Sequence, residues 1–241
     1  MTPSIKNKVM KTKIKAILFD IDGTILNAGN AGKKAFMQAA KEVFGFTGTM
    51  QRVDFQGRTD RYILEESFKN SPLHPEELNL KIELMKKAYI GALKTTIYQY
   101  ETVLFPGIEE ALNKIYKDPH IILGLLTGNF MESAFIKLAR FGLDKFFSLG
   151  AYGEDSINRN ELVPIAQKRI LENKGLHLDF SRMIIIGDTV HDIECAKASG
   201  AVSISVGTGL TPKETLMDKN PDYYFDNLAD TETFLKVISG I

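Results

Sequence analysis

Residues 16–24 read Ala-Ile-Leu-Phe-Asp-Ile-Asp-Gly-Thr, and this stretch decides the fold. Its first four residues are a short apolar run, which predicts a β-strand covered on both faces. Two acids and a turn-forming Gly-Thr pair follow at once. The same design recurs in Ile121–Leu126, which ends in Thr-Gly-Asn, and in Met183–Ile186, which ends in Gly-Asp-Thr. We therefore expect three buried strands that each end in a polar turn.

Helical patterns separate these strands. They cover the ranges Ile108–Tyr116, Met131–Phe141, Val163–Glu172 and Val190–Ser199, and the last of them stops before Gly200 at a typical cap position. A weaker strand pattern, Ala201–Val206, follows. Strands that alternate with helices at this spacing predict an α/β fold with a doubly wound (Rossmann-like) parallel sheet.

One stretch has helical periodicity and no convincing strand. It contains three predicted helices, Ala31–Phe44, Asp60–Phe68 and Pro75–Tyr98. We interpret it as an all-helical cap domain, residues 27–100, inserted into a core domain made of residues 1–26 and 101–241. The linkers are expected near Leu26–Gly32 and Tyr100–Pro106.

Acidic residues follow the predicted strands at one edge of the sheet. Asp20 and Asp22 follow the first strand, Thr127 the second, and Asp188 and Asp192 the third. Ligands of open parallel sheets bind at the carboxyl ends of the strands, so these side chains are expected to converge. A single Asp after a strand is often only a turn or cap residue. Clustered carboxylates are more typical of a divalent cation site, and Mg²⁺ suits carboxylates combined with a substrate phosphate.

The same residues resemble a known family. Phe19–Thr24 resembles the first motif of the haloacid dehalogenase superfamily of phosphotransferases, Leu125–Gly128 is similar to the second, and Ile185–Asp192 is similar to the fourth. The insert resembles the type-I helical cap of that family. Phosphoglycolate phosphatase-like proteins are the nearest general resemblance, from Phe105–Ile108 and the Pro-Asp pair at 221–222.

The resemblance assigns roles to the acids. Asp20 is the expected nucleophile, which forms an aspartyl-phosphate. Asp22 is the expected acid that protonates the leaving oxygen and the base that then activates water. Asp188 would hold Mg²⁺ together with a carboxylate oxygen of Asp20 and the backbone carbonyl of Asp22. Asp192 is expected either to bind the metal through water or to orient a ligand.

Phosphate-binding roles follow from the second motif. The Thr127 hydroxyl and the backbone amides of Gly128 and Asn129 are expected to bind phosphate oxygens. The N-terminus of the helix that begins at Met131 is expected to help them, because helix N-termini attract anions.

The third motif departs from the family pattern, which supplies a Lys or Arg before a Pro-started helix. Here the segment 158–164 reads Asn-Arg-Asn-Glu-Leu-Val-Pro. Arg159 is the first candidate for the phosphate-binding cation and Lys168 the second, and either is also compatible with an ordinary surface position. In the insert, Arg58 is a candidate for substrate specificity, although Thr59 or Asp60 in the same turn could be there merely to cap a helix.

Composition limits the classes of function. The 241 residues contain 30 Lys+Arg and 30 Asp+Glu, which argues against a nucleic-acid binder held by a basic field. The insert is mildly basic, with 11 basic and 8 acidic residues, and the rest is acidic. One cysteine excludes a disulfide framework, and no apolar run is long enough to cross a membrane. We expect a cytoplasmic monomer or small homo-oligomer that binds no nucleic acid and no membrane. Residues 1–15 are expected to form a frayed basic tail.

Together these features predict a Mg²⁺-dependent phosphatase that hydrolyses a small phosphorylated metabolite. Two alternatives remain open. The first is a phosphomutase of the β-phosphoglucomutase kind, although the insert lacks the His–Lys pair that this resemblance would require. The second is a non-catalytic module that binds a phosphorylated ligand, for which at least one broken catalytic position would be expected.

Overall fold

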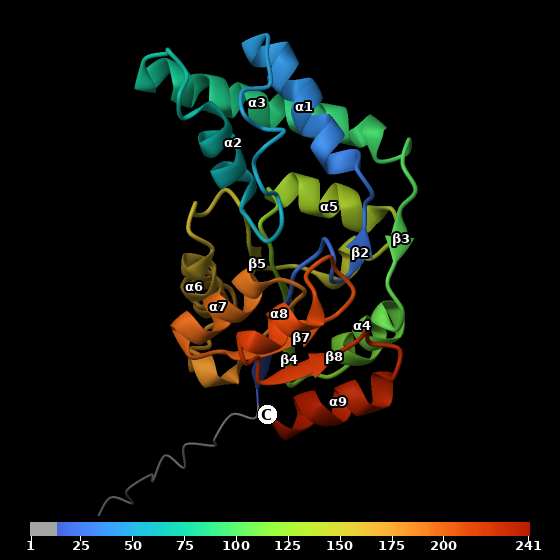
Figure 1. The fold of residues 1–241 in the computed structure, drawn as a ribbon. Helices are drawn as coiled ribbons and strands as arrows, with labels where there is room; N and C mark the ends of the chain where they lie inside the picture. The colour runs from blue at the N-terminus through green and yellow to red at the C-terminus, as the bar shows by residue number, and fades with distance from the viewer. Residues whose placement is uncertain (1–13) are drawn as a thin grey trace, which may run out of the picture.

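A computed structural model describes residues 14–241 (Figure 1), so most of the predicted basic tail lies outside the described residues. The core is a six-stranded sheet in the order β5-β4-β1-β6-β7-β8, and every pairing is parallel. Its strands are β1 (Lys15–Phe19), β4 (Ile121–Leu126), β5 (Gly150–Ala151), β6 (Met183–Gly187), β7 (Val202–Val206) and β8 (Tyr223–Phe225). The predicted fold class is confirmed.

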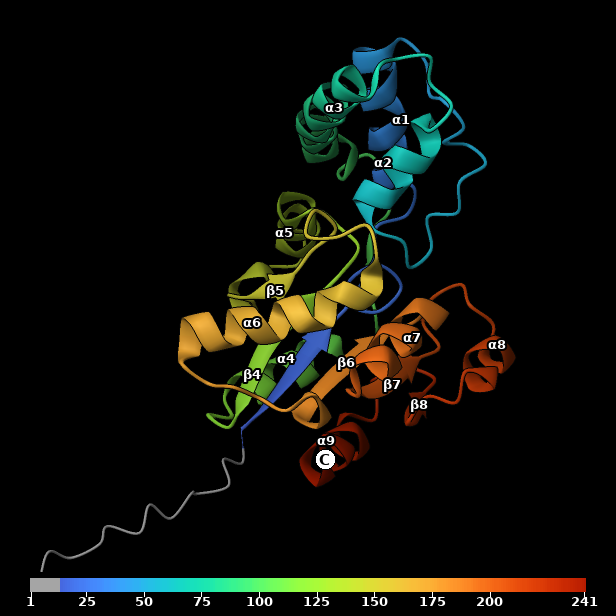
Figure 2. The same ribbon diagram turned by 90° about the vertical axis from the view of Figure 1, so that its left-hand side faces the viewer.

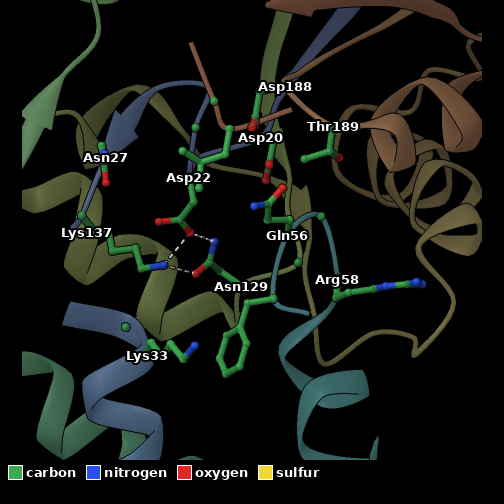
Figure 3. Close-up of a pocket in the computed structure, with 18 of the residues that line it drawn as sticks. Asp20, Asp22, Asn27, Lys33, Gln56, Arg58, Asn129, Lys137, Asp188 and Thr189 are labelled. Carbon is green, nitrogen blue, oxygen red and sulfur yellow. Dashed lines mark hydrogen bonds and ion pairs between the residues drawn. The ribbon is translucent and has the colours of Figure 1, made fainter. Parts of the chain in front are cut away.

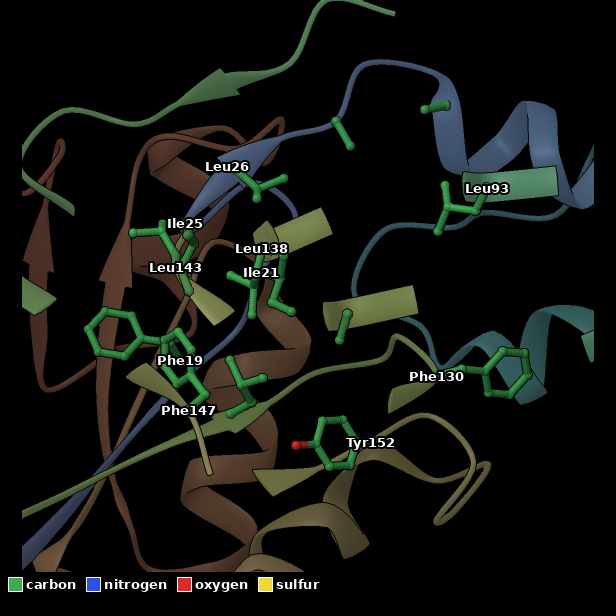
Figure 4. Packing of buried hydrophobic residues seen from close by; sticks show 14 of the residues in the cluster. Phe19, Ile21, Ile25, Leu26, Leu93, Phe130, Leu138, Leu143, Phe147 and Tyr152 are labelled. Carbon is green, nitrogen blue, oxygen red and sulfur yellow. The ribbon is translucent and has the colours of Figure 1, made fainter. Parts of the chain in front are cut away.

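Strand β1 lies at the centre of the sheet because both of its faces are apolar. Ile17 and Phe19 pack on one face, and Ala16 and Leu18 on the other, and all four side chains are fully buried. The first face, shown around Phe19 in Figure 4, also takes apolar side chains from α4 (Ile108–Tyr116) and α9 (Thr231–Gly240). The second face is covered by α6 (Leu162–Lys174) and α7 (Val190–Ser199), which lie together in Figure 2. Helices on both faces make the sheet doubly wound.

The insert forms a helical layer above the carboxyl ends of the strands (Figure 1). It contains α1 (Ala31–Phe44), α2 (Asp60–Phe68) and α3 (Pro75–Thr96). Helices α1 and α3 pack along each other, and the rings of Phe36 and Tyr89 stack with centroids 3.9 Å apart. The first two helices have the predicted bounds, and α3 ends two residues before the predicted Tyr98.

The two linkers between core and insert pair with each other. Strand β2 (Leu26–Asn27) and strand β3 (Val103–Leu104) form an antiparallel ribbon. The ribbon continues into the core through the Phe105 N–H, which donates to the Ile25 carbonyl at 3.1 Å. The division at residues 27 and 100 stays a prediction, and this ribbon lies at the predicted linkers.

The remaining elements complete the core. They are α5 (Met131–Ala139), α8 (Lys213–Asp218) and the short 3-10 helices Asp144–Phe146, Arg159–Glu161 and Phe180–Arg182. Helix α5 ends two residues before the predicted Phe141, close to Gly142, which has a φ of 64°. None of the helices in the described part of the chain is long and apolar enough to cross a membrane.

Candidate active site

A cavity of about 270 Å³ lies between the carboxyl edge of the sheet and the helical insert (Figure 3). Core residues such as Asp20, Asp188 and Asn129 line one side of it. Insert residues such as Phe36 and Tyr89 line the other. The chain therefore places its predicted site residues at a boundary between two structural units, where ligand sites are common.

Three buried aspartates lie together at this edge of the sheet, and two of them, Asp20 and Asp188, line the cavity. Asp20 follows β1, Asp188 follows β6, and Asp192 lies in the first turn of α7. One carboxylate oxygen from each lies within 4.8 Å of the others. The parallel pairing of β1 with β6, with Phe19 opposite Ile186, brings the two strand ends to the same point.

The electrostatics of this cluster call for a positive charge. Burial raises the pKa of Asp20, and Arg159 opposes that shift. Burial also raises the pKa of Asp188 well above its usual value, and the neighbouring carboxylates of Asp192 and Asp20 add to the shift. Ionised carboxylates at this depth need an additional counter-charge. An oxygen-rich set of this kind fits a hard divalent cation.

Local backbone geometry keeps space open beside Asp188. Gly23 has a φ of 84°, and a Cβ atom there would lie 2.3 Å from Asp188 Oδ2. A Cβ atom at Gly209 would lie 1.7 Å from the same oxygen. The Thr24 hydroxyl donates to Asp188 Oδ1 at 3.0 Å and orients the carboxylate. Only glycine fits at the first position, because the left-handed backbone and the close approach both exclude a side chain.

Arg159 is the third-motif candidate that reaches the site. Its Nη2 lies 3.3 Å from Asp20 Oδ1 and 2.5 Å from Asp192 Oδ1, and its side chain is only 7% exposed. The alternative, Lys168, has a side chain that is 74% exposed and pairs with Glu172 on the surface of α6. The geometry therefore favours Arg159 over Lys168 as the cation that pairs with the predicted nucleophile, Asp20.

Both carboxylate oxygens of Asp192 already have protein partners. Oδ1 pairs with Arg159, and Oδ2 accepts from the Thr189 N–H at 3.0 Å and the Thr189 hydroxyl at 2.6 Å. This capping box holds the start of α7. Of the two roles predicted for Asp192, orienting a ligand fits these contacts better than direct coordination, and the assignment stays a prediction.

The Asp22 side chain faces away from the aspartate cluster (Figure 3). Its Oδ2 lies 2.5 Å from Lys137 Nζ and accepts from Asn129 Nδ2 at 2.8 Å. The side chain is 43% exposed, in contrast to buried Asp20. The carboxylate predicted to transfer protons is therefore spatially separate from the carboxylate predicted to attack.

The second-motif residues lie between Asp22 and the insert. Thr127 is fully buried, and its hydroxyl accepts from Asn129 Nδ2 at 2.9 Å and from the Asn129 N–H at 3.3 Å. Gly128 passes so close to the insert that a Cβ atom would lie 2.0 Å from the Arg58 carbonyl oxygen. The predicted phosphate-binding turn is thus wedged under the insert.

One expectation about this turn is wrong. The N-terminus of α5 was expected to help bind phosphate, but protein carboxylates occupy its amides. The Phe130 N–H donates to Asp60 Oδ2 and the Met131 N–H donates to Glu154 Oε2, both at 2.8 Å. These acids satisfy two of the amides at the helix terminus and place negative charge there, which disfavours a phosphate.

Arg58 lines the cavity, but its guanidinium points away from Asp22 and Lys137 (Figure 3). Its Cζ lies over the ring of Tyr62, 4.8 Å from the centroid. The specificity role of Arg58 stays a prediction. Another cation of the insert, Lys33, also lines the cavity and lies 5.5 Å from the centroid of the Phe55 ring.

Sequence reasoning missed Lys33, Asp60 and Lys137. A signal existed for Lys137, which occupies a core-facing position of α5 beside Ala134 and Leu138, where a charged residue is unusual. Asp60 carries no such signal, because acidic residues near helix N-termini are ordinary.

Comparisons with known proteins find relatives that match most of the chain. The chain is 26% identical over 221 residues to a pyrophosphatase, PpaX, of Listeria welshimeri. The match covers 92% of this chain and 96% of the relative. It is also 26% identical over 221 residues to a phosphoglycolate phosphatase of Vibrio vulnificus, with 90% and 94% covered. A crystal structure of a predicted phosphoglycolate phosphatase from Haemophilus somnus superposes with a TM-score of 0.67 at 21% identity, over 93% of this chain and 99% of the other.

The family model for haloacid dehalogenase-like hydrolases matches residues 17–206, a range that contains the aspartates after β1 and β6 and the cation beside them. The chain therefore belongs to the family of haloacid dehalogenase-like hydrolases.

Proposed function

We propose that this protein is a Mg²⁺-dependent phosphatase that hydrolyses a small phosphomonoester through an aspartyl-phosphate on Asp20. The observation that carries the proposal is the placement of Asp20. It is buried beside Arg159 in a cluster with Asp188, and a second, half-exposed acid, Asp22, lines the same cavity. A nucleophile and a separate proton donor facing one cavity are the groups that phosphoryl transfer to a carboxylate requires.

The residues present fit a divalent cation. Asp20 and Asp188 would hold it together with the Asp22 backbone carbonyl. Asp192 would either bind the cation through a water molecule or orient Arg159, with which it pairs. When bound, Mg²⁺ would offset negative charge on the carboxylates and on the phosphoryl oxygens. The raised pKa values of Asp20 and Asp188 support this assignment, because burial without a counter-charge disfavours their ionised forms.

The first half-reaction transfers the phosphoryl group. An Asp20 oxygen attacks phosphorus as the bond from phosphorus to the leaving oxygen breaks. Asp22 gives its proton to that leaving oxygen, so the product leaves as an alcohol. Arg159, which is held against Asp20, offsets the charge of the nucleophile and of the phosphoryl group.

The second half-reaction regenerates the enzyme. Water attacks the phosphorus of the aspartyl-phosphate, Asp22 accepts the proton of that water, and the bond from phosphorus to Asp20 breaks to release phosphate. Thr127 and the backbone amides of Gly128 and Asn129 are proposed to bind the phosphoryl oxygens through both steps. The insert would exclude bulk water while the intermediate exists.

A small metabolite suits the cavity of about 270 Å³, which is just below the usual range of ligand-pocket volumes. The two relatives named above act on pyrophosphate and phosphoglycolate by their names, and both compounds are small and carry a second anionic group. Lys33 of the insert lines the cavity and would be available to such a group.

The test is a panel of small phosphate esters and p-nitrophenyl phosphate, assayed for phosphate release with Mg²⁺ and with EDTA. We expect hydrolysis that EDTA abolishes and that Asp20→Asn eliminates. Failure to hydrolyse any compound would overturn the proposal, and hydrolysis unaffected by EDTA would overturn its metal requirement. A mutase would instead isomerise a sugar phosphate, and a binding module would bind phosphate esters without turnover.

A further inference from the structure

Lys137 is a buried lysine to which the proposed mechanism assigns no role. It lies in α5 among the core-facing residues Ser133, Ala134 and Leu138 and is only 5% exposed. Lysine is almost never buried to this degree unless its ammonium group is paired, because desolvation of the charge is costly. Its partners therefore indicate its function.

The Lys137 ammonium forms a closed triangle with two residues of the candidate site (Figure 3). Its Nζ lies 2.5 Å from Asp22 Oδ2 and 2.6 Å from Asn129 Oδ1. Asn129 completes the triangle, because its Nδ2 donates to the same Asp22 oxygen at 2.8 Å. Asp22 is thus held by two donors that come from α5 and from the turn that precedes it.

Both donors use the same oxygen of Asp22. Within residues 14–241, the side-chain hydrogen bonds to this carboxylate end on Oδ2. The Asp22 side chain is 43% exposed and lines the cavity. This arrangement fixes the rotation of the carboxylate and keeps Oδ1 available to a group in the cavity.

The second cation of the site does not share this task. Arg159 pairs with Asp20 and Asp192 and donates to the carbonyls of Gly57 and Leu126, so none of its partners is Asp22. The site therefore contains two separate cation–carboxylate pairs, one for each carboxylate that follows β1.

We propose that Lys137 is a positioning residue for proton transfer by Asp22, an inference that rests on the proposed phosphatase function. Lys137 holds Oδ2, and the proton passes from Oδ1 to the leaving oxygen while the bond from phosphorus to that oxygen breaks. The electrons of the O–H bond stay on Asp22 as negative charge, and the adjacent ammonium stabilises that charge. The contribution is greatest when the leaving oxygen is a poor leaving group.

The test compares leaving groups in the Lys137→Met variant. The parameter is kcat/KM, which reports the steps up to release of the leaving group. An alkyl phosphomonoester needs the proton of Asp22, whereas p-nitrophenol leaves as a stable anion. We expect kcat/KM to fall about 10²–10³-fold for the alkyl ester and less than about fivefold for p-nitrophenyl phosphate. Across substituted phenyl phosphates, the rate should depend more steeply on leaving-group basicity than in the wild type.

Two further variants separate charge from structure. Lys137→Gln keeps a hydrogen-bond donor without the charge, so its selective loss should be intermediate. Lys174→Met, which removes an exposed lysine at the end of α6, should change the rate on neither substrate. If Lys137→Met does not fold, Lys137→Gln and Asn129→Ala must carry the same selectivity for alkyl esters.

Equal losses on both substrates would overturn the inference, because they would indicate a merely structural lysine, and so would unchanged rates on both. These results leave the phosphatase proposal intact. The phosphatase proposal itself fails only if the wild-type protein hydrolyses none of the phosphate esters in the panel.

Discussion

The two carboxylates that follow β1, Asp20 and Asp22, each pair with a cation, but they do so in different surroundings. We call these surroundings the nucleophile side and the proton-transfer side of the cavity. On the nucleophile side, Asp20 is almost fully buried and its cation, Arg159, binds a second carboxylate as well. On the proton-transfer side, Asp22 remains 43% exposed, and Lys137 holds it by one oxygen. A nucleophile benefits from a rigid and dry position, because its attack angle must be fixed. A proton donor must meet first a leaving group and then water, so it needs one open oxygen.

The largest difference between the two sides is expected from Asp20→Asn. Loss of the nucleophile should lower kcat by at least about 10⁴-fold, measured as phosphate release. The thermal midpoint should not fall, because burial and neighbouring carboxylates raise the pKa of Asp20 and its ionised form therefore costs folding free energy. Asp218→Asn, on the exposed surface of α8, is the matched control and should change neither quantity. A destabilised Asp20→Asn protein would contradict this description of the nucleophile side.

Arg159→Ala should have the next largest effect. We expect kcat/KM to fall about 10²–10³-fold, whereas Lys168→Ala stays within about twofold. Denaturant unfolding should also show a loss of about 3–5 kcal/mol for Arg159→Ala, because Asp20 and Asp192 would stay buried without their partner. If Lys168→Ala loses turnover and Arg159→Ala does not, the two candidates exchange roles.

Magnesium should stabilise the nucleophile side in particular. At about 100 times its Kd, Mg²⁺ should add about 2.7 kcal/mol to the free energy of unfolding, detected as a rise in the thermal midpoint. Asp188→Asn should remove most of this rise, because it deletes one of the three carboxylates of the cluster. Asp22→Asn should keep it, since its side chain lies outside the cluster. A rise of equal size in all three proteins would place the cation elsewhere.

A smaller, pH-dependent effect is expected on the proton-transfer side. Burial raises the pKa of Asp60 to about 7, while Lys137 and the Phe130 N–H oppose the shift. We call the molecule closed when the insert is packed on the core and open when it is not. If the pKa of Asp60 is higher in the closed state than in the open state, the protonated carboxyl stabilises the closed state. That contribution is complete below about pH 4 and is lost as the pH rises through about 7.

The ratio of proteolytic cleavage rates of wild type to Asp60→Asn measures this effect, because the ratio cancels the pH dependence of the protease. We expect cleavage in the segment 52–58 to rise about 30-fold in this ratio between pH 5.5 and pH 8.5. A constant ratio would show that Asp60 titrates alike whether the insert is open or closed.

The smallest effect is expected from Arg58→Ala. Because its guanidinium stacks on Tyr62 and points away from Asp22, KM should change less than about threefold. Lys33→Ala should raise KM about tenfold for a substrate with a second anionic group. A larger effect at Arg58 than at Lys33 would support the specificity role predicted from the sequence.

Sequence patterns predicted the core well because buried strands and amphipathic helices leave periodic signals. The apolar runs at residues 16–19, 121–126 and 183–186 became β1, β4 and β6, and the acids that follow β1 and β6 converge. Strands of two residues, such as those in the linkers, are too short to show a period.

The site was predictable only where its residues follow strand ends. Lys137 reaches Asp22 from the middle of a helix, and Asp60 reaches α5 from another unit of the chain. Both contacts depend on tertiary packing, which places residues 115 and 70 positions apart side by side. The wrong expectation for the α5 N-terminus has the same origin, since its amides were taken by acids distant in sequence.

The ribbon of β2 and β3 has a consequence for how such an insert can be carried. The chain entering the insert and the chain leaving it pair at Leu26 and Leu104. The insert is therefore attached to the core in the same way as the loop of a β-hairpin. Whatever lies beyond the ribbon adds little loop-closure entropy to the folding of the core. The sheet and its carboxylates could therefore persist through evolution while the helices above them were lengthened, shortened or exchanged. The core would then keep the chemistry constant while the insert varies the substrate, and the two-residue strands β2 and β3 would mark the boundary between them.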